Sequence, residues 1–162
     1  MKTKQIIRNL LAVLILGSLI IWAKREVSKS QEYSAAEGQA PPTEDTLPII
    51  DGPQVIMTYF LSGTRCESCK TIEALSQETA ETDFPNELAS NQLIYRVVDT
   101  DKPTDHHYVK DYELTSKTVV LSRRLNGKEN DWKDMDKVWD HLDDPQAFRT
   151  YLGEQVRAYL GS

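Results

Sequence analysis

Between positions 54 and 80, the apolar residues change from a continuous run to a helical repeat. Val55–Phe60 is a run of mostly apolar, β-prone residues, which predicts a buried strand. Ile72, Leu75 and Thr79 then recur at the spacing of one helix face, which predicts a helix over Cys66–Ala80. A short turn separates the two elements, so the chain passes almost directly from a strand into a helix.

The same alternation of strand and helix patterns continues to the C-terminus. We expect strands at Gln92–Val98, Thr118–Ser122 and Lys128–Lys133, a helix over Asp105–Tyr112 capped by Thr104, and a last helix that opens at Pro145. The first helix is expected to extend to, or kink at, Pro85. Asn126-Gly127 is a hairpin-turn signal between the last two strands. Strands joined through a helix are parallel and a hairpin is antiparallel, so this order predicts an α/β domain with a central mixed sheet.

The first 29 residues have a different pattern. Ile6–Ala23 is almost wholly apolar and has basic residues on both sides. This pattern is typical of a signal peptide or of a single membrane anchor. Because basic residues directly follow the apolar run, we favour a retained, single-pass anchor over residues 1–29 in the cell membrane. In both cases the rest of the chain is expected on the exported side, periplasmic or extracytoplasmic, where disulfides persist.

Composition divides the remainder of the chain at about residue 53. Residues 30–53 carry five acidic residues, no basic ones and four of the seven prolines, which predicts a disordered tether. Residues 54–162 are enough for one domain with a single hydrophobic core. Their 13 basic and 19 acidic residues are mixed along the chain, which excludes nucleic acid as an expected partner, because phosphate binding needs a basic patch. The densest basic stretch, which includes Lys117, is interleaved with acids and predicts a solvated face.

The chemistry of the chain centres on its two cysteines, Cys66 and Cys69. Chance would place two cysteines at this spacing in about one chain in a hundred of this length. They lie at the start of the predicted first helix, where unpaired N–H groups and the helix dipole stabilise a thiolate. We expect Cys66 near the N-cap as the exposed attacking thiol and Cys69 on the core-facing stripe as the shielded resolving thiol. A dithiol at this point after a strand predicts a thioredoxin-like three-layer fold whose dithiol cycles by thiol–disulfide exchange.

Other uses of the cysteine pair stay open. A structural disulfide would close a loop so short that it removes little unfolded-state entropy. A closed zinc site needs four ligands, and the chain has no second cysteine pair. The main alternative is a binding module for a soft metal or a metalloid such as As(III), since paired thiolates select soft ions. His106 and His107 are expected as a surface pair, with a contribution to a metal site as the alternative. No glycine run fits a flavin or nicotinamide fingerprint, and we expect no cofactor.

Several short motifs resemble those of one family. They are Tyr59-Phe60, Cys66-x-x-Cys69 with Ile72-Glu73, Val97-Val98-Asp99, Tyr108-Val109-Lys110-Asp111-Tyr112, Lys117-Thr118-Val119-Val120-Leu121, Trp132-Lys133 and Lys137-Val138-Trp139. Together they resemble exported bacterial thioredoxin-like proteins of the nitrophenyl-compound nitroreductase accessory subunit family, over nearly all of residues 54–160. The resemblance implies a thioredoxin-like fold and a redox dithiol. We accordingly expect a protein redox partner, with a membrane electron carrier among the candidates.

The chain departs from ordinary thioredoxins around the dithiol. Their buried carboxylate lies six residues before the first cysteine, where this chain has Phe60. Their cis-proline precedes the third strand and faces the dithiol, but Thr115–Thr118 contains no proline, so we expect a trans backbone there. The Gly-Pro pair between their cysteines is replaced by Glu67-Ser68. The missing proline weakens the case for general disulfide reductase activity and strengthens the metal-binding alternative.

Overall fold

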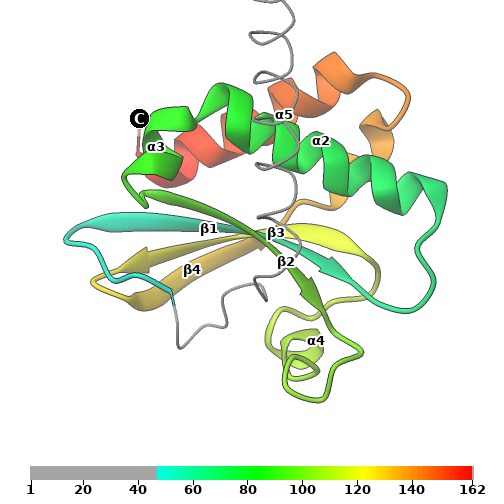
Figure 1. The fold of residues 1–162 in the computed structure, drawn as a ribbon, viewed down its shortest axis with the longest axis horizontal. Coiled ribbons are helices and arrows are strands. Elements are labelled where there is room, and N and C mark those ends of the chain that lie inside the picture. The colour runs from blue at the N-terminus through cyan, green and yellow to red at the C-terminus, as the bar shows by residue number, and fades with distance from the viewer. Residues whose placement is uncertain (1–46, 162) are drawn as a thin grey trace, which may run out of the picture. The chain divides into compact units, whose positions relative to one another are not determined.

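The computed structural model of the chain describes residues 47–161 (Figure 1). The expected membrane anchor at residues 1–29 and the expected tether as far as residue 46 lie outside the described residues. Between residues 47 and 161, no helix has the length and hydropathy needed to cross a membrane. The described chain forms a thioredoxin-like α/β domain, as the sequence predicts.

Strands and helices alternate along this domain in the predicted order. The elements are β1 (Pro53–Leu61), α2 (Glu67–Asp83), α3 (Pro85–Ala89), β2 (Leu93–Asp99), α4 (Tyr108–Asp111), β3 (Thr118–Leu125), β4 (Lys128–Asp134), the 3-10 helix η2 (Asp136–His141) and α5 (Pro145–Leu160). The sequence pattern did not predict η2. Pro85 does not kink the first helix but begins α3 as a separate short helix.

The four strands form one mixed sheet in the order β2-β1-β3-β4. β1 pairs in parallel with β2 and antiparallel with β3, and β3 pairs antiparallel with β4. The helices α2, α3 and α5 cover one face of the sheet, and α4 lies on the opposite face (Figure 1). The predicted three-layer arrangement is therefore confirmed, with β1 as a central strand that leads directly to the dithiol.

The two faces of β1 serve two separate hydrophobic clusters, because side chains alternate along a strand. Tyr59 packs in the larger cluster, with residues of α2 and α5 such as Ile72 and Phe148. Phe60 packs on the other face, in a cluster that includes Tyr108 and Tyr112. β1 is thus buried on both sides, which explains its nearly continuous apolar run.

The ends of the later elements form where the sequence places them. Asn126 and Gly127 both have positive φ, at 52° and 79°, which is the backbone of a type I′ hairpin turn. The Asp144 side chain accepts hydrogen bonds from the N–H groups of Gln146 and Ala147, and Pro145 occupies the first turn of α5. The hairpin signal and the start of the last helix are both confirmed.

The predicted helix over Asp105–Tyr112 is wrong in its first half. α4 spans only Tyr108–Asp111, and its N-cap is His107 rather than Thr104. The preceding residues form a series of turns instead, with the N–H of Asp105 bonded to the carbonyl of Lys102. The Asp99 carboxylate also accepts from the N–H of Asp101, and such side-chain bonds favour turns over helix.

The domain begins earlier than the composition indicates. β1 starts at Pro53, and Leu47 is buried. The Gln54 side chain donates hydrogen bonds of 3.0 and 2.9 Å to the carbonyls of Pro48 and Asn91. Residues 47–53, the last part of the expected tether, are thus held against the domain by burial and side-chain hydrogen bonds that a count of prolines and acids does not reveal.

Candidate functional site

The two cysteines are joined by a disulfide at the start of α2. The Cα atoms of Cys66 and Cys69 lie 5.0 Å apart and their sulfurs are bonded. Cys66 is the N-cap of α2 with an extended backbone, and its sulfur accepts a hydrogen bond from the N–H of Cys69 at 3.2 Å. The disulfide therefore lies shortly after the end of β1, at the positive end of the dipole of α2, as the sequence predicts.

The two cysteines differ in their access to solvent. Cys66 is an exposed residue, whereas Cys69 is 2% exposed. Cys69 shares the inward face of α2 with Ile72 and Leu75. The predicted geometry of an exposed and a shielded cysteine is confirmed, and an incoming group can reach Cys66 far more easily than Cys69.

The charged residues around the start of α2 pair with one another. Arg65 forms an ion pair with Glu73, and Lys70 forms one with Glu67 at 2.8 Å. The hydrogen bond from Lys70, helped by its charge, lowers the pKa of Glu67 below the usual range. These pairs leave the local charge near the exposed sulfur close to balanced.

Two tyrosines of the sheet hold α2 in place. The hydroxyl of Tyr59 donates to the carbonyl of Cys69 at 3.0 Å, and that of Tyr95 donates to the carbonyl of Glu73 at 3.1 Å. Burial raises the pKa of both phenols, and the charge of Arg65 only partly offsets this. Both hydroxyls therefore stay protonated, as donors, and fix the cysteine-bearing turn against β1 and β2.

Lys117 lies directly against the buried sulfur. Its Nζ is 3.5 Å from the Sγ of Cys69 and also donates to the carbonyl of Thr64 in the loop before α2. The indole N–H of Trp139 donates to the carbonyl of Lys117 at 3.0 Å, which fixes the backbone at the same residue. The expectation of a solvated face is wrong for Lys117, because the fold brings the end of the loop before β3 up to the disulfide.

Phe60 stands at the sequence position where ordinary thioredoxins have their buried carboxylate. It is 1% exposed, and its ring lies 5.3 Å from that of Tyr108 and 5.4 Å from that of Tyr112. The described residues contain no cis peptide bond, so the backbone before Thr118 is trans, as expected. Position 60 thus contributes to an aromatic cluster on the face of β1 opposite α2, and it supplies no proton acceptor to the dithiol.

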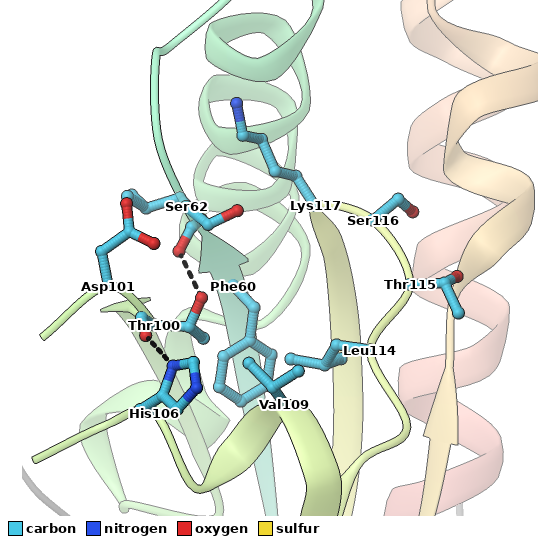
Figure 2. A pocket seen from close by; sticks show the side chains of 11 residues that line it. Phe60, Ser62, Thr100, Asp101, His106, Val109, Leu114, Thr115, Ser116 and Lys117 are labelled. Atoms are coloured by element: carbon cyan, nitrogen blue, oxygen red, sulfur yellow. Dashed lines mark hydrogen bonds between the residues drawn. The ribbon is translucent and has the colours of Figure 1, made fainter. Parts of the chain in front are cut away.

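A pocket of about 250 Å³ is lined in part by Lys117, the residue that contacts the sulfur of Cys69 (Figure 2). Phe60, Val109 and Leu114 gather at its apolar end, while Asp101 and Lys117 lie toward the opposite end (Figure 2). The remaining walls are Leu61, Ser62, Thr100, His106, Thr115 and Ser116. Lys117 both lines the pocket and contacts Cys69. A partner chain bound in the pocket can therefore also meet the disulfide through this residue.

The histidines make local contacts. The Nδ1 of His106 lies 3.1 Å from the carbonyl of Thr100, and that of His107 lies 2.7 Å from a carboxylate oxygen of Asp111. Across residues 47–161, no three His, Cys, Asp or Glu side chains come together in a way that could hold a metal ion. The structure therefore brings Cys66 and Cys69 together without bringing a histidine to them.

Several residues of the site were missed in the sequence. The sequence places Lys117 among other basic residues, and Tyr59 and Tyr95 lie inside runs that predict only strands. The position of Lys117 one residue before β3, where a thioredoxin-like fold faces its dithiol, is the signal that could have singled it out. Nothing in the local pattern distinguishes the two tyrosines from other strand residues.

Comparison with known proteins does not identify a family for the chain. No protein-family model matches the chain, and no curated protein matches it. The resemblance to the nitroreductase accessory subunit family is therefore not supported.

Solved structures similar to the chain are thioredoxins. A thioredoxin of Fasciola hepatica is 18% identical, with 67% of this chain and 83% of that chain covered and a TM-score of 0.42. An oxidised thioredoxin of Plasmodium falciparum is 16% identical, with coverages of 66% and 82% and a TM-score of 0.40. A thioredoxin of Malassezia sympodialis is 17% identical, with coverages of 69% and 80% and a TM-score of 0.41. All three scores are below 0.5, so the thioredoxin-like fold rests on the strand order and helix positions described above.

Proposed function

We propose that this protein is a thiol–disulfide exchange protein whose Cys66–Cys69 pair cycles between disulfide and dithiol. The observation that carries the proposal is the asymmetry of the pair: an exposed sulfur at a helix N-cap is bonded to a sulfur that is buried one turn later. The N-terminal end of a helix stabilises a thiolate, which is the reactive species in disulfide exchange. An inert structural disulfide has no need of such an exposed, activated sulfur.

In the proposed cycle, a partner thiolate attacks the Sγ of Cys66. A new bond forms between the partner sulfur and Cys66, the Cys66–Cys69 bond breaks, and its electron pair stays on the sulfur of Cys69. A second partner thiolate then releases Cys66 by attacking the partner sulfur of the mixed disulfide. The protein gains two electrons and the partner becomes a disulfide. The reverse sequence, with Cys66 as attacker and Cys69 as resolving thiol, reduces a partner disulfide.

We propose that the partner is a protein, with a membrane electron carrier as one candidate for the electron donor. The pocket lined in part by Lys117 supports this proposal, because it offers apolar and hydrogen-bonding groups to residues that flank a partner cysteine. A small thiol would need only the exposed Cys66. A partner side chain in this pocket would also meet Lys117, which contacts Cys69, so the shape of the pocket would give selectivity among partners.

We further propose that residues 1–29 anchor the protein in the membrane and that the domain lies on the exported side. The support is the apolar run Ile6–Ala23 with basic residues on both sides, and we place its basic N-terminal flank in the cytoplasm. After a carbonate wash of membranes, the anchored protein stays in the pellet. Recovery of a shortened soluble form that begins near Lys24 would contradict the anchor and indicate a cleaved signal.

Trapping of the mixed disulfide tests the exchange proposal. In a Cys69→Ser variant of the full chain, Cys66 has no resolving thiol, so oxidised glutathione should leave one glutathione attached, detected as a mass increase that dithiothreitol removes. The matched Cys66→Ser variant, which keeps the buried thiol, should be labelled far more slowly. Equal labelling of the two variants, or no labelling of either, would contradict the assigned roles.

The same preparation separates exchange from the alternative function, capture of a soft metal or metalloid. Two sulfurs supply only two ligands, and we expect weak, non-stoichiometric binding of zinc or copper by the reduced chain. Tight one-to-one binding by the reduced wild type, together with no glutathione labelling of Cys69→Ser, would favour the metal-binding module.

A further inference from the structure

We infer that Lys117 is a catalytic residue of the exchange reaction, and that its ammonium group stabilises the thiolate of Cys69 when the disulfide opens. This inference rests on the proposed function and assigns a role that the cysteine pair alone cannot fill. Its basis is the contact between the Nζ of Lys117 and the Sγ of Cys69, at 3.5 Å.

The direction of the reaction makes Cys69 the sulfur that needs help. Because Cys66 is exposed and Cys69 is buried, an incoming thiolate attacks Cys66 and the sulfur of Cys69 is the leaving group. A buried thiolate is costly unless a charge or a hydrogen-bond donor meets it. The ammonium group of Lys117 supplies both a charge and a hydrogen-bond donor, and it already contacts Cys69 while the disulfide is closed.

The other polar groups near the pair do not serve this purpose. Arg65 and Lys70 are engaged with Glu73 and Glu67. The hydroxyl of Tyr59 points to the carbonyl of Cys69, at 3.0 Å, rather than to its sulfur. Phe60, on the opposite face of β1, carries no proton acceptor. Lys117 is thus the charged side chain that meets the buried sulfur.

The structure also holds Lys117 in position for this role. Its side chain donates to the carbonyl of Thr64, and its own carbonyl accepts from Trp139. Both ends of the residue are therefore fixed before the reaction begins, so stabilising the thiolate requires little rearrangement. Preorganised donors of this kind are effective where charge develops during a reaction.

The inferred step is balanced and needs no group beyond the partner thiol. As the partner sulfur bonds to Cys66, the electron pair of the broken S–S bond passes to Cys69, and Lys117 donates a hydrogen bond to the resulting thiolate. The lysine keeps its proton, and the thiolate later exchanges a proton with water. In the reverse direction the same contact keeps Cys69 deprotonated for its attack on Cys66.

The inference is tested by the rate at which dithiothreitol reduces the disulfide of the full chain at pH 7. Opposite charges at such distances favour a thiolate strongly, so we expect Lys117→Met to slow reduction about tenfold. Lys117→Arg should recover most of the rate, because it keeps a cationic donor. Lys70→Met is the matched control: it removes the same charge from the exposed side of the site and should change the rate by less than about twofold.

A second readout excludes a merely structural effect. In a Cys66→Ser background, the pH at which alkylation of Cys69 reaches half its maximal rate should rise by about one unit when Lys117 is replaced by Met. Equal reduction rates for Lys117→Met and wild type, or an unchanged alkylation profile, would overturn the role of Lys117 while leaving the exchange function intact. If the wild type itself fails to exchange, the proposed function fails instead.

Discussion

The Nζ of Lys117 lies 3.5 Å from the Sγ of Cys69, across 48 positions of sequence. The contact joins the loop before β3 to the first turn of α2, two segments that the central position of β1 brings together. Cys69 is the buried member of the pair. The site therefore combines an exposed Cys66, which meets the partner, with a buried Cys69, whose thiolate Lys117 stabilises.

The first prediction concerns the two thiols of the reduced protein. At neutral pH, iodoacetamide should modify the remaining thiol of Cys69→Ser at least about tenfold faster than that of Cys66→Ser, because Cys66 is exposed at the N-cap and Cys69 is buried. Mass spectrometry of quenched samples gives both rates. Faster modification of the Cys69 thiol would reverse the assigned roles.

The second prediction concerns the pocket. Thr115→Trp places a large side chain on the exposed rim of the pocket, so exchange with a protein disulfide such as that of insulin should slow by about tenfold. Exchange with oxidised glutathione should stay within about twofold, because Cys66 itself is unobstructed.

The matched control for the pocket is Thr150→Trp, which puts the same bulk at an exposed position on α5 away from the pocket. It should leave both reactions unchanged. If Thr115→Trp slows both disulfides equally, or neither, the pocket has no part in partner selection.

The third prediction concerns Phe60, which packs in the aromatic cluster on the face of β1 opposite α2. Phe60→Asp removes an aromatic ring that packs against both Tyr108 and Tyr112 and buries a carboxylate, so it should lower the free energy of unfolding by about 3 kcal/mol or more. Phe60→Leu, which keeps an apolar side chain, should cost about 1 kcal/mol. Urea unfolding followed by tryptophan fluorescence measures both. Equal stability of the two variants would show that the interior here can hold a charge.

The fourth prediction concerns the pH dependence of stability through Asp134. Burial raises the pKa of this carboxyl above its usual value, with the nearby charge of Asp136 adding to the effect and the hydrogen bond from Thr118 opposing it. The folded protein therefore holds a proton on Asp134 at a pH where the unfolded chain has lost it. The contribution of Asp134 to stability is fully present below the unfolded value of 3.8 and falls as pH rises through the folded value.

Replacing Asp134 by Asn, which keeps an oxygen for Thr118, removes this titration. The difference in unfolding free energy between wild type and Asp134→Asn should shift in favour of the variant as pH rises from about 3.5 to 6. Urea titrations at several pH values measure the difference. A shift in favour of the wild type over the same interval would contradict the sign of the pKa change.

Much of this fold is predictable because its signals are local. The continuous apolar run of β1, the repeat of Ile72 and Leu75 in α2, the Asn126-Gly127 turn and Pro145 at the start of α5 each depend on a few neighbouring residues. The cysteine positions follow from the same signals, since the end of a strand and the start of a helix fix the N-cap.

The parts that could not be predicted depend on contacts between distant segments. Lys117 reaches Cys69 only because β3 pairs with β1, and Leu47 is buried although composition places it in a tether. The shortened α4 reflects a series of side-chain and backbone turns that compete with helix formation over residues 101–107. The periodicity of a sequence carries no information about such long-range contacts or about turns that compete with a helix.

The most direct test of redox cycling at Cys66 and Cys69 is the reduction potential of the pair in the full chain. The protein is equilibrated with graded ratios of reduced and oxidised glutathione or dithiothreitol, and free thiols are alkylated and counted by mass. We predict that both thiols appear together in one two-electron transition, with a midpoint between about −270 and −120 mV, the range of redox-active dithiols. A pair that stays oxidised until the potential falls below about −300 mV, as structural disulfides do, would contradict redox cycling at this site.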